Sequence, residues 1–64
     1  MYRIRELREE RNLMQKDLAI AASISRPYLH DLENNRRGAK PDTLKRIADA
    51  LGVKVEELTE RAAG

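Results

Sequence analysis

Residues 15–32, with the sequence QKDLAIAASISRPYLHDL, constrain the fold of this chain more than any other stretch. Their apolar spacing predicts two short helices, over 15–22 and 26–34, joined by a tight turn. Ser25 is well placed to cap the second helix with its hydroxyl, and Pro27 suits its first turn because the missing N–H has no intrahelical partner there. The sequence therefore predicts a helix pair whose second member leaves polar and aromatic side chains on its outer face.

The stretches on either side of this pair predict three further helices. Ile4 and Leu7 form the narrow apolar stripe of a first helix, and a fourth helix is expected over 41–51. A short last helix is expected over 56–61. We therefore expect an all-α, compact five-helix fold that forms a single domain over residues 1–64.

Composition excludes several classes of protein. With 64 residues, no cysteine and one histidine, the chain has neither a disulfide framework nor a thiolate metal site, and we expect no bound metal. No apolar run approaches the ~20 residues of a membrane span and the N-terminus lacks a signal layout, so we expect a cytoplasmic protein that binds no membrane. No nucleophile–base pair, glycine-rich phosphate loop or carboxylate cluster stands out. We therefore expect no enzyme, no catalytic residues and no cofactor.

The positive charge is concentrated in one segment. The net charge is only +2, but residues 34–46 hold five Lys or Arg against one Asp, which gives 5 − 1 = +4. This segment directly follows the second helix of the pair, where it can serve as an electrostatic footprint for a polyanion. A solvated basic loop explains the charge equally well when the charge is taken alone.

Five segments of the chain resemble, in register, the Cro/C1-type helix-turn-helix domain of lambdoid phage repressors and of Xre-type bacterial regulators. The segments are Ile4-Arg5-Glu6-Leu7-Arg8, Gln15-Lys16-Asp17-Leu18-Ala19, Tyr28-Leu29-His30-Asp31-Leu32-Glu33-Asn34, Thr43-Leu44 and Ile47-Ala48-Asp49-Ala50-Leu51-Gly52-Val53. The resemblance implies a lambda-repressor-like fold with its helix-turn-helix core at about 15–34. It also implies a sequence-specific transcriptional regulator that binds double-stranded DNA, acting as a repressor and as a homodimer on a near-palindromic operator.

The resemblance and the chemistry of the side chains together indicate the DNA contacts. The expected base contacts lie on the second helix of the pair: Arg26, Pro27, Tyr28, His30 and Asp31. The expected phosphate contacts flank it: Gln15, Lys16, Ser25, Asn34, Arg36, Arg37 and Lys40. Arg26 is the first candidate for bidentate contact with a guanine, with a phosphate contact or free solvent as the alternative. Tyr28 and His30 are equally compatible with ordinary surface positions.

Pro27 and Asp31 differ from the polar base-reading groups, such as glutamine, that many family members carry at these positions. Proline cannot donate a hydrogen bond and aspartate can only accept one, so the operator of a relative does not transfer to this chain. Ser23 and Asn35 occupy positions where the family usually has glycine, at a cost of about 1–2 kcal/mol for a non-glycine residue.

The resemblance also implies a structural ion pair between Arg8 in the first helix and Glu33 at the end of the third. The alternative is that Arg8 and Glu33 are two exposed charges that do not contact each other.

A second function remains open on the sequence alone. The chain could be an antitoxin, or another interaction module that neutralises a partner protein, because the same fold serves in such pairs.

Overall fold

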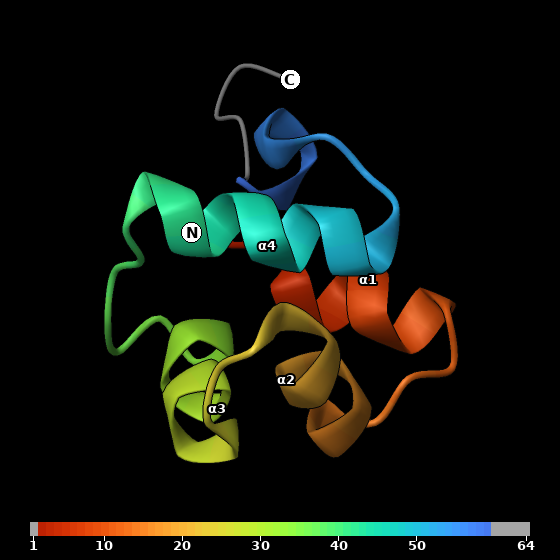
Figure 1. Cartoon of the computed structure of the whole chain (residues 1–64), viewed down its shortest axis with the longest axis horizontal. Helices are drawn as coiled ribbons and strands as arrows, with labels where there is room; N and C mark the ends of the chain where they lie inside the picture. The colour runs from red at the N-terminus through yellow and green to blue at the C-terminus, as the bar shows by residue number, and fades with distance from the viewer. Residues whose placement is uncertain (1, 60–64) are drawn as a thin grey trace.

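The computed structural model describes residues 2–59, which fold into four α-helices and one short 3₁₀ helix (Figure 1). The elements are α1 (Ile4–Glu10), α2 (Gln15–Ala22), α3 (Arg26–Glu33), α4 (Pro41–Leu51) and η1 (Val55–Leu58). In Figure 1, α4 crosses above α2 and α3, and η1 lies on the other side of α4. α2 packs against both α3 and α4, and α1 packs against α3. The all-α fold is therefore confirmed, and no helix in this part of the chain is long and apolar enough to cross a membrane.

The C-terminal member of the expected five helices is a shorter turn than predicted. Instead of a helix over 56–61, the chain forms the four-residue η1, after which Thr59 is extended and pairs with Tyr2 in an isolated antiparallel bridge. Leu58 is fully buried, and its carbonyl accepts the N–H of Arg3. Because the Leu58 carbonyl is bonded to the N-terminal segment, it is not used to continue the helix, which ends after one turn. Short 3₁₀ helices are common as connectors of this kind. The end of the predicted helix lies outside the described residues.

The helix pair matches its predicted bounds closely. α2 covers the predicted range 15–22, and α3 ends at Glu33, one residue earlier than predicted. The Ser25 hydroxyl accepts the backbone N–H of Tyr28 at 3.2 Å, which confirms the predicted cap. The cap and Pro27 in the first turn fix where α3 begins, and they therefore fix which side chains lead that helix.

All four α-helices end in the same way, with a left-handed residue and a hydrogen bond that spans five residues. The left-handed residues are Asn12, Ser23, Asn35 and Gly52, with φ of 57°, 59°, 58° and 73°. After α1, α2 and α4 the next residue is apolar and packs against the core: Leu13, Ile24 and Val53. After α3 the next residue is Arg36, which is exposed. The chain therefore leaves α3 for solvent, as a polar loop over 35–40.

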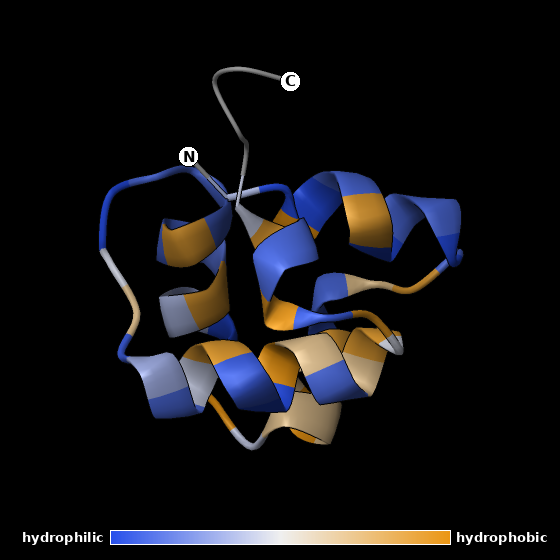
Figure 2. Cartoon of the chain, turned by 90° about the horizontal axis from the view of Figure 1, so that it is seen from above, coloured by the Kyte–Doolittle hydropathy of each residue, from blue (hydrophilic) through white to orange (hydrophobic). Residues whose placement is uncertain are grey.

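A single core joins the helices. Each helix in Figure 2 carries both hydrophobic and hydrophilic residues, as expected for helices with one buried face. The buried apolar residues come from all five elements: Ile4, Leu7, Leu18, Ala19, Ala22, Leu29, Leu32, Ile47, Ala48, Leu51 and Leu58. Leu29 and Leu32 supply the inner face of α3, so the outer face of that helix is left to solvent.

Candidate nucleic-acid interface

Four of the five predicted base-contact residues lie around one shallow hollow at the outer face of α3. Arg26, Pro27, His30 and Asp31 line it, and Gln15 from the start of α2 completes it. The first three are exposed, whereas Asp31 and Gln15 are half-buried. The fold therefore brings the first residue of α2 next to the front of α3, as a joint contact of phosphate and bases requires.

Tyr28 lies apart from this hollow, on the side of the basic loop. Its half-buried ring packs against the core, and the guanidinium of Arg37 lies over the ring at 5.4 Å from the centroid. A cation at this distance from an aromatic face is attracted to it. The contact connects the loop to α3.

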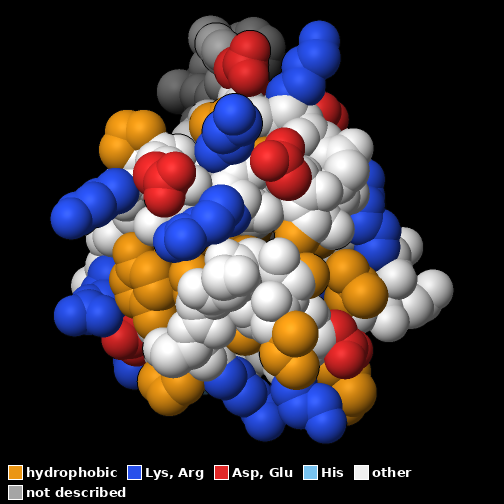
Figure 3. All heavy atoms as spheres, in the orientation of Figure 1, with side chains coloured by type: hydrophobic (Ala, Val, Ile, Leu, Met, Phe, Trp, Pro, Cys, Tyr) orange, Lys and Arg blue, Asp and Glu red, His pale blue; other side chains and the backbone are white. Residues whose placement is uncertain are grey.

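The other predicted phosphate contacts with cationic side chains are all exposed: Lys16, Arg36 and Lys40. Figure 3 shows Lys and Arg side chains, with acidic and hydrophobic ones among them, along the lower edge of the molecule, and basic and acidic side chains mixed over α4. The basic segment over 34–46 includes the first half of α4, so its positive charge is divided between the loop and this mixed surface.

Gln15 is held by internal hydrogen bonds. Its Nε2 donates to Glu33 Oε1 at 3.0 Å and lies 3.4 Å from His30 Nδ1. The amide has two N–H groups, and the longer contact is the weaker one. One N–H is therefore available for a phosphate if the contact with His30 gives way.

Arg8 and Glu33 form a buried ion pair between α1 and α3. Arg8 donates from Nε to Glu33 Oε2 at 2.7 Å and from Nη2 to Oε1 at 3.1 Å, while its Nη1 donates to the carbonyl of Leu13 at 2.7 Å. The side chain of Glu33 is 0% exposed and that of Arg8 is 11% exposed. Through its further bond from Gln15, the Glu33 carboxylate connects α1, α2 and α3.

The pKa of Glu33 is lowered below its ordinary value. Burial alone raises the pKa of a carboxyl, but the hydrogen bonds from Arg8 and Gln15, together with the charges of Arg8 and Arg5, outweigh burial. The carboxylate therefore stays ionised at neutral pH, although no part of its side chain reaches solvent.

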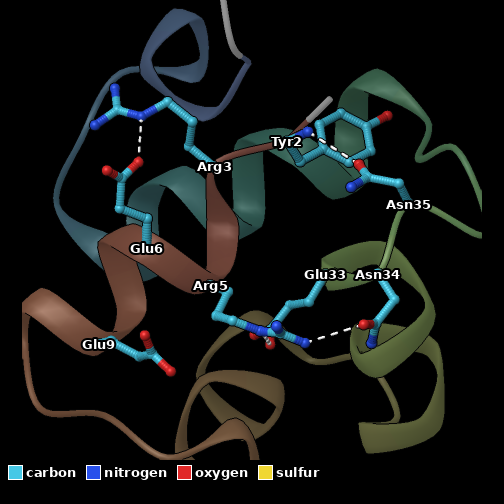
Figure 4. A pocket seen from close by; sticks show the side chains of 8 residues that line it. All are labelled: Tyr2, Arg3, Arg5, Glu6, Glu9, Glu33, Asn34 and Asn35. Carbon is cyan, nitrogen blue, oxygen red and sulfur yellow. Dashed lines mark hydrogen bonds and ion pairs between the residues drawn. The ribbon is translucent and has the colours of Figure 1, made fainter.

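Arg5 is a contributor that the sequence interpretation missed. Its Nη2 donates to Asn34 Oδ1 at 3.0 Å and its Nε lies 3.6 Å from Glu33 Oε1 (Figure 4). Asn34 in turn donates from Nδ2 to the carbonyl of His30 at 2.8 Å. Arg5 lies three residues before Arg8, and this spacing, which places both on one helix face, was the available signal. The predicted phosphate contact Asn34 is thus already fixed in the free protein.

No group of three His, Cys, Asp or Glu side chains among residues 2–59 is arranged to hold a metal ion. Every buried side-chain nitrogen or oxygen in the same range has a hydrogen-bond partner. The arrangement offers an exposed helix front, the exposed Lys16 at the start of α2, the basic loop after α3, and a buried ion pair that joins α1 to α3.

An exposed helix, supported across a tight turn by a second helix whose first residue lies beside it, defines a helix-turn-helix domain. The chain belongs to the helix-turn-helix family of the Cro/C1 type, whose sequence model matches residues 4–58. The family predicted from the five sequence segments is therefore confirmed.

Named relatives are regulators. The chain is 50% identical over 58 residues to the HTH-type transcriptional regulator DdrOP3 of Deinococcus deserti and 43% identical over 56 residues to the immunity repressor protein of Bacillus phage phi105. These matches cover 91% and 88% of this chain but 45% and 39% of those proteins, so the chain spans less than half the length of either relative.

A solved structure matches over most of its length. The crystal structure of the restriction-modification controller protein C.AhdI from Aeromonas hydrophila superposes with a TM-score of 0.86 at 32% identity, covering 89% of this chain and 86% of that one. None of these three relatives is named as an enzyme.

Proposed function

We propose that this chain is a sequence-specific regulator of transcription that binds double-stranded DNA and acts as a repressor. The observation that carries the proposal is the hollow formed by the front of α3 and Gln15, with exposed cations in the neighbouring segments of the chain, Lys16 at the start of α2 and Arg36 and Lys40 after α3. The names of the relatives, a transcriptional regulator and an immunity repressor, support the same function.

Base recognition falls to the front of α3 in this proposal. An α-helix fits the major groove of B-DNA, and residues at its N-terminal end reach deepest. Arg26 is the first residue of α3 and is exposed, so its guanidinium is free to make a bidentate contact with a guanine. Asp31 can accept a hydrogen bond from a cytosine amine, and Pro27 can make only apolar contacts.

Contact with the DNA backbone falls to the two flanks. Lys16 and the free N–H groups of the first turn of α2 can hold one phosphate, and Arg36, Arg37 and Lys40 can hold others on the far side of α3. Such contacts position the protein without reading sequence.

A homodimer on a near-palindromic operator, with half-sites about 34–36 Å apart, would double this small interface. Repression then follows from occupying a promoter, in the cytoplasm, without a further cofactor. The repressor and dimer assignments rest on the family and on the small size of one interface.

The proposal is tested by titrating the protein with a duplex selected from a random pool, and with a random duplex, at several salt concentrations. Arg36→Ala should weaken binding to both duplexes alike. Arg26→Ala should cost about 1–3 kcal/mol on the selected duplex only. Lys54→Ala removes the same charge beside η1, on the other side of α4 from the candidate interface, and serves as the control.

Binding that shows no steep dependence on salt, or no preference for the selected duplex over the random one, would refute the proposal. Equal losses on both duplexes for Arg26→Ala would remove that residue from base recognition. A stable complex with a partner protein, in the absence of DNA binding, would favour the antitoxin alternative.

A further inference from the structure

The basic loop over 35–40 is held by a different device from the other three helix ends. After α1, α2 and α4, an apolar residue follows the left-handed position and packs on the core. Such a contact commonly accompanies this type of helix end. After α3 the equivalent residue is the exposed Arg36, so the loop lacks that anchor.

Tyr2 supplies an anchor from the N-terminal segment. Its backbone N–H donates to Asn35 Oδ1 at 3.2 Å (Figure 4), and its hydroxyl accepts the backbone N–H of Ala39 at 3.0 Å. The two bonds hold the loop at both ends and enclose Arg36 and Arg37 between them. We call the contact of Tyr2 with Asn35 and Ala39 the Tyr2 clasp.

Tyr2 is itself fixed to the body of the domain. It pairs with Thr59 in the antiparallel bridge, its half-buried ring packs against the core, and the next residue, Arg3, donates its N–H to Leu58. The clasp therefore connects the loop to a rigid support rather than to another loop.

The clasp also accounts for Asn35 at a position where the family usually has glycine. Asn35 has φ of 58°, a conformation that asparagine adopts more readily than most residues. Unlike glycine, it offers a side-chain acceptor, and Tyr2 uses that acceptor. Asn35 thus adopts the left-handed conformation that ends α3 and also accepts the hydrogen bond from Tyr2.

We propose that Tyr2 and Asn35 are positioning residues that hold the cations of the basic loop in place for contact with the DNA backbone. The inference rests on the proposed function. A loop ordered in the free protein loses less conformational entropy when its cations bind phosphates. Breaking the clasp should therefore weaken binding to every sequence, although neither residue carries a charge.

Two variants and one control test the clasp. Tyr2→Phe removes only the hydroxyl that Ala39 uses, and Asn35→Gly removes the acceptor while suiting the positive φ. Thr59→Val is the matched control, because it removes a hydroxyl that donates to the carbonyl of Glu56 and leaves the backbone of residue 59 free to keep its pairing with Tyr2. Each protein is titrated with the selected and the random duplex over a range of salt, and its thermal midpoint is measured.

Both clasp variants should bind the two duplexes roughly three- to tenfold more weakly, which is the effect of about one hydrogen bond. The slope of log affinity against log salt should become shallower by about one for each DNA phosphate that the loop no longer neutralises. Thr59→Val should leave both quantities unchanged. Affinity and salt slope that stay at the wild-type values in both clasp variants, whatever happens to the thermal midpoint, would overturn the inference.

Hydrogen exchange of the Ala39 amide in the free protein separates the clasp from the proposed function. The amide should be protected in the wild type and exchange faster in Tyr2→Phe. An unprotected Ala39 amide in the wild type would show that the clasp does not form. A protected amide in a wild type that binds no duplex would instead refute the proposed function, and with it the role of the clasp on DNA.

Discussion

Replacing Glu33 by glutamine tests whether the buried ion pair supports the fold behind α3. Glu33→Gln keeps the shape of the side chain but removes the charge that Arg8 contacts at 2.7 and 3.1 Å. It also places an amide N–H₂ group where Arg8 and Gln15 both donate. Arg8, only 11% exposed, is then left without a counter-charge.

The expected loss is about 3–5 kcal/mol, the usual cost of removing one partner of a buried pair. A chain of this length has a total stability of about 3–10 kcal/mol, at roughly 0.05–0.15 kcal/mol per residue. Glu33→Gln should therefore remove about a third or more of the stability of the domain.

Glu6→Gln is a matched control. Glu6 accepts a hydrogen bond from Arg3 at the same distance, 2.7 Å, but the two side chains are 57% and 37% exposed. Exposed pairs contribute about 0–1 kcal/mol because water screens them. The same chemical change at the same distance should thus have a several-fold smaller effect, because the Glu6 site is exposed and its carboxylate accepts one hydrogen bond, whereas Glu33 is buried and accepts three.

Urea unfolding followed by far-ultraviolet circular dichroism measures both variants. Glu33→Gln should lower the midpoint strongly without changing the dependence of the free energy of unfolding on urea. A loss below about 1 kcal/mol for Glu33→Gln, equal to that of Glu6→Gln, would refute the argument that burial makes the Arg8 pair essential.

Three other predictions concern pH and the helix ends. Because the pKa of Glu33 is lower in the folded state than its unfolded value of about 4.3, the stabilisation from Glu33 is present above that pH and is lost as pH falls through the folded pKa. The difference in stability between the wild type and Glu33→Gln should accordingly shrink in acid, and a constant difference down to low pH would contradict the shift. Ser23→Gly should stabilise the protein by about 1 kcal/mol because Ser23 has φ of 59°, whereas Gly52→Ala should cost about 1–2 kcal/mol at φ of 73°, where an added Cβ meets no atom within 4 Å. A loss of stability for Ser23→Gly, or a gain for Gly52→Ala, in urea unfolding would show that backbone strain is not the cause. Ser25→Ala should cost about 1 kcal/mol through loss of the cap on Tyr28, and an unchanged midpoint would show that the cap contributes nothing.

Local signals in the sequence predicted most of the fold. Pro27 and Pro41 mark the first turns of α3 and α4, and Ser25 caps α3 as its position indicates. The left-handed conformations of Ser23 and Asn35 followed from comparison with the usual glycines of the family. The cap and the proline positions depend on neighbours within a few residues, so they can be inferred from the order of the residues alone.

Contacts between distant residues could not be inferred in that way. The bridge between Tyr2 and Thr59 shortens the last helix, and no local pattern signals a pairing across the whole domain. The Arg8–Glu33 pair came from the resemblance, since periodicity indicated only that Arg8 needs a partner. The additional contact of Arg5 with Asn34 joins residues far apart in the chain, and only the shared helix face of Arg5 and Arg8 pointed toward it.

For the same reason, only part of the candidate site could be predicted from the sequence. The front of α3 could be placed on one helical face, and the structure gathers four of its residues around one hollow with Gln15. The position of Tyr28 under Arg37 depends on how the loop returns, which the sequence does not determine. Assignment of each side chain to bases or phosphates remains a prediction.

Selection of bound duplexes from a random pool is the most direct test of the central claim that this chain reads DNA sequence through the front of α3. The account predicts enrichment of one near-palindromic motif, with the wild type preferring it over random DNA and Arg26→Ala losing preference at a defined position in each half-site. A pool that shows no enriched sequence after repeated rounds, or an enriched motif that Arg26→Ala selects unchanged, would contradict the claim.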